Sequence, residues 1–297
     1  MPDAMHTDGK ISVLNGFIEL AADLIDARAD ERGAAWFRAA RHEVAQTGGD
    51  RALSVAIGLA PRRLGKADLS LDAADLARAE ELRPGLDLND WSIDQLARAA
   101  LMAASYRDGD TFAARFASFC AAAEINELVA LYRGLPVYPD AALLEARARD
   151  AVRSGMKPVF EAVAHRNPFP REVFADDAWN QMVVKALFMG STLWPIQGLD
   201  ERANPGLARM LVGLAQERWA AGRPVSVETW RCVAPHADRE GTEALLRAWN
   251  ADGDKARLAI ALAVQNAPHA AAGLAANEIA ELQARLVAEG LNWPDLA

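Results

Sequence analysis

Apolar residues recur along the chain at the three- and four-residue spacings of helices with one buried face. In residues 11–28, for example, Leu14, Phe17 and Ala21 fall on one side of a helix. The same pattern predicts helices over residues 31–47, 51–60, 70–82, 92–106, 109–122, 124–133, 140–153, 156–166, 171–190, 205–221, 226–233, 240–250, 254–266 and 276–289. No two segments alternate as paired strands, so the pattern predicts an all-α fold.

The lengths of these helices and of the turns between them favour stacked helix pairs. Residues 240–268 form the clearest unit, in which an acidic turn around Asp252 is followed by Arg257 and an Ala-rich helix, as in a HEAT-like repeat. We expect one elongated domain over residues 1–297, built as a right-handed helical solenoid. An irregular helical bundle is the alternative. About one residue in five is Ala and only 7% are aromatic, a composition that favours helix throughout.

Charge and motif content exclude several classes of function. A net charge of -9 argues against nucleic acid as a partner. Cys120 and Cys232 are isolated and are expected to be core residues, and the sequence contains no motif for a metal, a nucleotide or another cofactor. It has no run of apolar residues long enough to span a membrane and starts unlike a signal peptide, so we expect a cytoplasmic protein.

Polar residues depart from this pattern between residues 134 and 235. A helical wheel for residues 171–190 places Trp179 on an apolar face with Met182, Val183, Ala186 and Met189. Asn180, Gln181 and Lys185 lie on the other face together with Val184 and Phe188. We therefore expect that second face to be covered as well, with its polar groups set in an apolar wall.

The following loop supplies partners for these polar groups. Asn204 and Pro205 read as the N-cap and first residue of the next helix. Asp200 or Glu201 is then expected to pair with Lys185 or Arg218. One interpretation is a satisfied network that fixes two helices together, and the other is a polar pocket for a ligand.

Two other features have simpler readings. The pair Asp176 and Asp177 resembles a magnesium-binding carboxylate motif, but Asn180 stands where a third carboxylate belongs, and acidic residues favour the first turn of a helix. Residues 167–170 are expected to form a stiff loop in which Phe169 plugs the core.

This central region resembles the EboA domain family. The residues that carry the resemblance are 167–170 (NPFP), 177–188 (DAWNQMVVKALF), 198–204 (GLDERAN), 217–218 (ER) and 222–224 (GRP). Phe169 stands where the family pattern is expected to have Tyr, so no role that needs a hydroxyl group is assigned there.

The resemblance implies a component of a bacterial gene cluster that handles a secondary-metabolite precursor, with traffic toward the periplasm. Cluster partners would include a UbiA-type prenyltransferase. The motif residues give a set of candidates for ligand binding or for a polar network, without a catalytic role. They are Trp179, Asn180, Gln181, Lys185, Asp200, Arg202, Asn204 and Arg218.

Three hypotheses follow. The first is a non-catalytic binding or adaptor protein whose pocket is lined by Trp179, Phe188, Trp194 and Trp219. The second is a metabolite-tailoring enzyme that uses Lys185 or Asp200 as acid or base. The third is a pure scaffold for the cluster enzymes.

Overall fold

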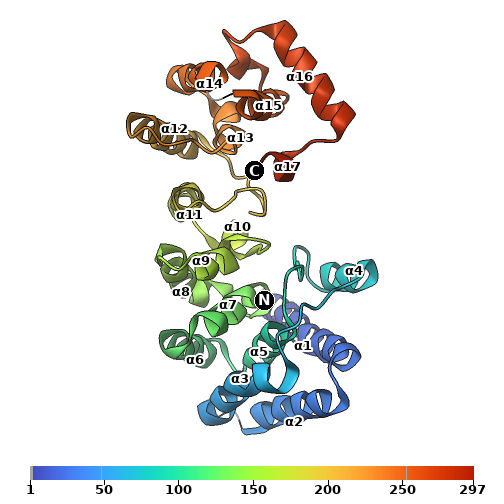
Figure 1. The fold of residues 1–297 in the computed structure, drawn as a ribbon. Coiled ribbons are helices and arrows are strands. Elements are labelled where there is room, and N and C mark those ends of the chain that lie inside the picture. The colour runs from blue at the N-terminus through green and yellow to red at the C-terminus, as the bar shows by residue number, and fades with distance from the viewer. Residues whose placement is uncertain (1–2, 48, 252) are drawn as a thin grey trace. The chain divides into compact units, whose positions relative to one another are not determined.

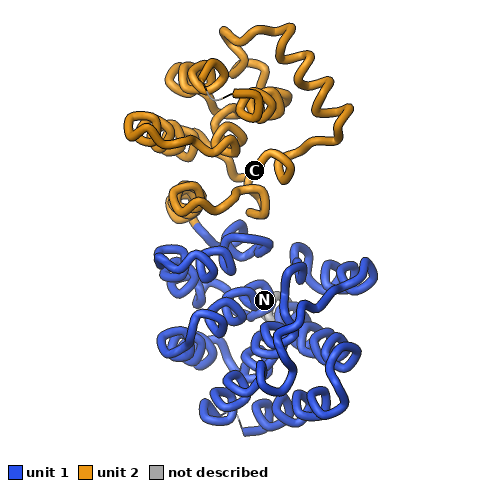
Figure 2. The backbone as a smooth tube through the Cα atoms, in the orientation of Figure 1, with its two compact units in different colours: residues 1–174 blue, residues 175–297 orange. Residues whose placement is uncertain are grey.

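The chain folds into helices that gather in two compact units. The computed structural model describes residues 3–47, 49–251 and 253–297, with side chains from residue 9 onward. Unit 1 is Met1–Phe174 and unit 2 is Ala175–Ala297 (Figure 2). The described residues form 17 α-helices and no strand beyond an isolated bridge between Asp68 and Ser92, which confirms the all-α class. The expectation of one elongated domain concerns the placement of the two units and stays a prediction.

Unit 1 contains ten α-helices and a short 3-10 helix. They are α1 (Asp3–Arg28), α2 (Glu31–Thr47), α3 (Asp50–Leu64), α4 (Ala73–Leu82), α5 (Ile93–Ala104), α6 (Gly109–Ala122), α7 (Ile125–Arg133), η1 (Leu135–Val137), α8 (Ala141–Arg153), α9 (Lys157–Ala164) and α10 (Phe169–Val173) (Figure 1). Helix α5 lies at the centre, in contact with α1, α2, α3 and α7, and α7 in turn contacts α9. Except for Gln95, every residue of α5 is buried, which suits its Ala-rich sequence.

A buried arginine joins α3 to α5. Arg98 is 1% exposed, and its Nη1 lies 3.2 Å from the Oδ2 of Asp94, one turn earlier on α5. Its Nε donates to the carbonyl of Ile57 at 3.1 Å. In a regular helix that carbonyl would accept the N–H of residue 61, but residue 61 is Pro and has none. Arg98 thus supplies the hydrogen bond that Pro61 removes.

This exchange corrects one predicted boundary. The sequence indicates a helix that stops at Ala60, before Pro61, whereas α3 continues through Pro61 to Leu64. The helix continues because the side chain of Arg98 satisfies the carbonyl that the proline leaves open.

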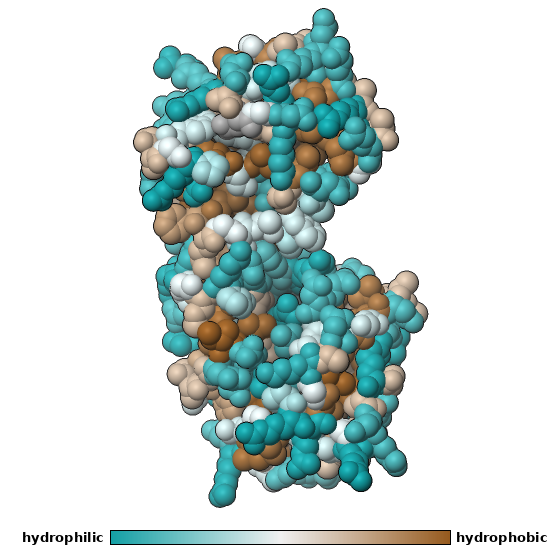
Figure 3. All heavy atoms as spheres, viewed as in Figure 1, coloured by the Kyte–Doolittle hydropathy of each residue, from teal (hydrophilic) through white to brown (hydrophobic). Residues whose placement is uncertain are grey.

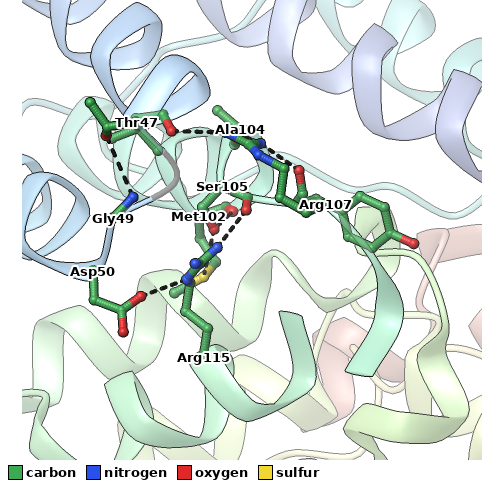
Figure 4. A network of polar contacts seen from close by, with 10 residues as sticks. Thr47, Gly49, Asp50, Met102, Ala104, Ser105, Arg107 and Arg115 are labelled. Carbon is green, nitrogen blue, oxygen red and sulfur yellow. Dashed lines mark hydrogen bonds and ion pairs between the residues drawn. The ribbon is translucent and has the colours of Figure 1, made fainter. Parts of the chain in front are cut away.

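Two further arginines tie the α2–α3 turn to the α5–α6 turn (Figure 4). The Nη1 of Arg115 donates to the carbonyl of Ser105 at 2.6 Å, and its Nε donates to Asp50 at 2.7 Å. Arg107 donates to the carbonyls of Val44 and Ala45 at the end of α2. Main-chain carbonyls that the helix ends leave without partners are satisfied in this way.

Unit 2 contains seven α-helices and two short 3-10 helices. They are α11 (Asp176–Phe188), α12 (Pro205–Ala220), α13 (Thr229–Val233), η2 (Ala234–His236), α14 (Arg239–Ala251), α15 (Gly253–Val264), η3 (Pro268–Ala271), α16 (Ala276–Glu289) and α17 (Trp293–Leu296) (Figure 1). Helix α12 packs on α11, α13 and α14, and α15 packs on α13, α14, α16 and α17.

The pair α14 and α15 matches the helices expected in residues 240–268. Helix α15 begins at Gly253, whose φ of 83° is favourable for glycine, and Arg257 donates to the carbonyl of Trp249 at 2.9 Å. Asp252, in the predicted acidic turn, lies outside the described residues.

The predicted helix over residues 171–190 is confirmed for residues 176–188, which form α11, but the prediction misses a break at Phe174 and Ala175 that separates α10 from α11. Both residues have extended backbone, with ψ angles of 132° and 161°. The break lets Phe174 turn into the core, where it is 3% exposed and meets the ring of Phe169 edge-on at 6.2 Å. Phe169 itself is 1% exposed, which confirms it as a core residue. It begins a short helix rather than lying in a loop.

Candidate functional site

The buried stripe of α11 is narrower than the sequence indicates. Trp179, Met182, Val183 and Ala186 are buried as predicted. On the second face, Asn180 is buried and Val184 and Lys185 are half-buried, in line with the expectation of a covered face. The expectation is wrong for Gln181, which is exposed, and for Phe188, which is 64% exposed. At about 100° per residue, both lie nearly opposite Trp179 and therefore project to solvent.

Asn180 lies at the edge of the buried stripe and pairs with Asn204. The two side-chain amides exchange hydrogen bonds of 3.1 and 2.8 Å. Asn204 also caps α12 as expected, because its Oδ1 accepts the N–H of Leu207 at 2.9 Å. Asn180 is 6% exposed, so this amide pair fixes α11 to the start of α12.

A glycine makes room for the amide pair. A Cβ atom on Gly206 would lie 3.0 Å from the Oδ1 of Asn204 and 3.3 Å from the Nδ2 of Asn180. The NPG run at residues 204–206 therefore combines a cap, a first helical residue and a site without a side chain.

Arg202 covers the buried indole of Trp179. Its guanidinium lies 4.7 Å from the ring centroid, and its Nη2 bonds Asp176 at 2.8 Å. Asp176 and Asp177 are exposed in the first turn of α11, where the helix dipole favours negative charge, as predicted.

Asp200 pairs with a residue that sequence reasoning missed. Its two oxygens accept from the Nε and Nη2 of Arg231, each at 2.7 Å, rather than from the predicted Lys185 or Arg218. Arg231 lies 31 residues away on α13, and no local spacing points to it. Lys185 is half-buried on α11. Trp179, Asn180, Arg202 and Asn204 are joined by contacts, because Arg202 covers Trp179 and its carbonyl accepts the Nδ2 of Asn204 at 3.1 Å. Asp200 pairs outside this cluster, with Arg231.

Arg218 borders a cavity. This cavity of about 240 Å³ lies within unit 2, among the ends of α11 and α12 and the start of α13. Its lining is mixed and comprises Leu187, Gly190, Ser191, Thr192, Leu214, Arg218, Pro224, Val225, Ser226, Glu228, Thr229 and Ala297. The Nε of Arg218 donates to the carbonyl of Pro224 at 2.6 Å. The expected lining residues Trp179, Phe188, Trp194 and Trp219 do not border this cavity.

Glu228 is the buried acid of this cavity. It is 1% exposed, and its oxygens accept the main-chain N–H groups of Leu193 and Trp194 at 2.8 and 2.6 Å. Burial raises the pKa of this carboxyl above its ordinary value, while the two N–H groups and Arg231 oppose that rise. In the sequence, Glu228 lies near the start of the helix predicted over residues 226–233, and its residue type does not indicate main-chain partners.

Aromatic packing joins α12 to α13. Trp219 stacks on the buried Trp230 with ring centroids 6.0 Å apart, and the guanidinium of Arg247 lies 4.2 Å from the Trp219 ring. Cys232, on the same short helix as Trp230, is fully buried as expected, and burial raises its pKa to about 12. This thiol is a core residue.

The described residues also lack the features of two other classes of site. They contain no group of three or more His, Cys, Asp or Glu side chains arranged to hold a metal ion. None of their helices combines the length and apolar character that a membrane crossing requires.

The comparisons with known proteins identify the family. Residues 17–234 match the family model described as metabolite traffic protein EboA. Neither the curated proteins nor the solved structures include a match to the chain. The matched segment contains α11, α12 and every cavity residue except Ala297. Because the match covers more than two thirds of the 297 residues, the chain belongs to the EboA family of metabolite traffic proteins.

Proposed function

We propose that this protein is a non-catalytic helical binding or adaptor protein that handles a secondary-metabolite precursor of its gene cluster, in traffic toward the periplasm. The observation that carries the proposal is the family match over residues 17–234, which includes the walls of the unit 2 cavity. The cavity is the binding site in this proposal, since ligand sites combine apolar lining with a few polar groups.

The contacts around the cavity support a preformed site. The amide pair of Asn180 and Asn204 holds α11 against α12, and Glu228 holds the loop that follows α11. A site held by such contacts loses little freedom when a ligand binds, which favours affinity.

The adaptor role draws on the way successive helices pack. In unit 1, α5 contacts α3 and α7, and α7 contacts α9, while α6 contacts α8. We infer a HEAT-like stacking of helix pairs from this pattern, because each repeat of a solenoid contacts its neighbours. Such surfaces suit docking of cluster proteins, a UbiA-type prenyltransferase among them, from the cytoplasm.

A pure scaffold is the second candidate, and exposed apolar side chains favour it. Phe188 on α11 and Met210 on α12 are 64% and 39% exposed. The face drawn in Figure 3 also shows hydrophobic patches between hydrophilic side chains. Exposed apolar groups of this kind serve protein contacts when they form a patch.

The enzyme alternative has less support. Asp200 is engaged through both oxygens by Arg231, a contact suited to joining α13 to the loop before α12.

A cavity-filling variant tests the binding role. Val225→Phe places a larger side chain in the cavity wall, and Val287→Phe makes the same change at an α16 position that is 79% exposed. Each variant replaces the wild-type gene, and metabolites of whole cells and periplasm are profiled beside a deletion strain.

We expect the Val225 variant to show the profile of the deletion strain and the Val287 variant to match wild type, with similar melting temperatures. A wild-type profile for a folded Val225 variant would remove the cavity from the proposal and leave the scaffold. In that case Phe188→Ser is expected to abolish the traffic instead.

A further inference from the structure

The size of the unit 2 cavity limits its ligand to a small molecule. An apolar protein cavity of about 150 Å³ is known to hold benzene. The volume here, about 240 Å³, fits one six-membered ring with one or two substituents, or a short chain of similar bulk. Leu187, Leu214 and Val225 supply the apolar wall for such a ring or chain.

Arg218, which lines this cavity, has hydrogen-bond donors without a protein partner among the described residues. Its Nε is committed to the carbonyl of Pro224. Its two Nη groups make no hydrogen bond or ion pair to any residue that the structure describes. A guanidinium with free Nη groups matches a carboxylate in charge and in shape, since its donors are spaced to contact both oxygens.

A carboxylate, that of Glu228, lines another part of the cavity. Glu228 is engaged by the N–H groups of Leu193 and Trp194 and forms no ion pair with Arg218 among the described residues. Each of its oxygens retains acceptor capacity after one hydrogen bond. Ser191 and Thr229, 4% and 1% exposed, add hydroxyl groups to the lining. This side therefore favours ligand groups that donate hydrogen bonds and disfavours an anion.

We propose that the cavity binds a small hydroxy- or amino-substituted carboxylate, with its carboxylate on Arg218 and its donor group toward Glu228, Ser191 and Thr229. This ligand class rests on the proposed function, because it names what the binding site takes up. The placement of Arg218 and Glu228 on different parts of the lining fixes the orientation in which the ligand binds.

The test uses defined probes and the full chain. Binding of benzoate, 3-hydroxybenzoate and their two amides is measured by ligand-observed NMR. Wild type is compared with Arg218→Gln, Arg218→Lys and, as a matched control, Arg223→Gln. Arg223 is an exposed arginine that does not line the cavity. Melting temperatures check that each variant folds.

We expect the acids to bind at least about tenfold more tightly than their amides, since hydrogen bonds between two charged groups are stronger than those to a neutral amide. 3-Hydroxybenzoate should bind more tightly than benzoate. Arg218→Gln should remove the preference for the acids, Arg218→Lys should weaken it because an ammonium lacks the paired Nη donors, and Arg223→Gln should keep it.

Equal binding of acid and amide by wild type overturns the ligand class, and this comparison stands even where Arg218→Gln fails to fold. A preference for the acids over their amides that survives in folded Arg218→Gln overturns the assigned site. If no probe binds while Val225→Phe abolishes metabolite traffic, the ligand class fails and the proposed function stands. If no probe binds and Val225→Phe also leaves metabolite traffic at the wild-type level, both the ligand class and the proposed binding function fail.

Discussion

The amide pair between α11 and α12 allows an experiment to distinguish the two interpretations of the candidate residues, a structural hydrogen-bond network and a ligand-binding pocket. Asn204→Ser removes the pairing amide but keeps an oxygen that caps α12, whereas Asn180→Ala removes the other half of the pair. The double variant completes a cycle. Asn180 is 6% exposed, so Asn204→Ser leaves a buried amide without its partner. Asn180→Ala leaves the half-buried amide of Asn204, which keeps its hydrogen bonds to the Arg202 carbonyl and the Leu207 N–H.

The magnitude follows from those contacts. Leaving a buried polar group unpaired costs about 1–3 kcal/mol, so Asn204→Ser should lose that much and Asn180→Ala should lose less. The second substitution then removes a group that is already unpaired, so the double variant should lose less than the sum. We expect a coupling energy of about 1–2 kcal/mol, within the range found for contacting residues.

Hydrogen exchange is the suitable assay because it reports each helix separately. Exchange of the amides of α11 and α12 in a urea series gives the stability of that region, with α2 as an internal reference in unit 1. Effects that add to within about 0.5 kcal/mol would refute the reasoning, since independent sites behave in that way. Unchanged stability together with lost metabolite traffic would instead favour direct ligand contact by Asn180.

Three further outcomes are expected. Gly213→Ala should stabilise α12 by about 0.5–1 kcal/mol in urea unfolding, because the added Cβ would have no heavy atom within 4 Å. Gly206→Ala should show no such gain, because its Cβ would crowd the side chains of Asn180 and Asn204. Burial raises the pKa of Glu228 from 4.5, so its native state holds the proton more tightly and stability should fall as pH rises from about 4.5 through the raised pKa. Glu228→Gln should remove that slope, and a slope that persists in the variant would assign it to other groups. Arg98→Met should cost about 3–5 kcal/mol by leaving a buried carboxylate unpaired, and a cost below about 1 kcal/mol in urea unfolding would contradict this account.

Local signals in the sequence predicted much of the fold. The bounds of α2 and α16 agree with the periodic patterns, and Asn204 caps α12 as its position before Pro205 indicates. These features depend on residues a few positions apart. The break between α10 and α11 depends instead on the burial of Phe174 against Phe169, which a helical pattern does not reveal.

The candidate site was harder to predict for the same reason. Asn180 and Asn204 pair as a network reading implies, yet Asp200 takes its partner from α13 and Gln181 faces solvent. Glu228 joins the cavity through contacts to main-chain N–H groups 34 and 35 residues away. Main-chain partners leave no trace in residue type, so the sequence could not indicate them.

The hydrogen bond from Arg98 to Ile57 also constrains how this sequence can change. A residue with an N–H group at position 61 would restore the ordinary helix bond and compete with Arg98 for the Ile57 carbonyl. Loss of Arg98 while Pro61 remains would strand that carbonyl in the core. Replacement of Arg98 alone is therefore costly, and relatives of this chain that keep the proline should keep the arginine as well.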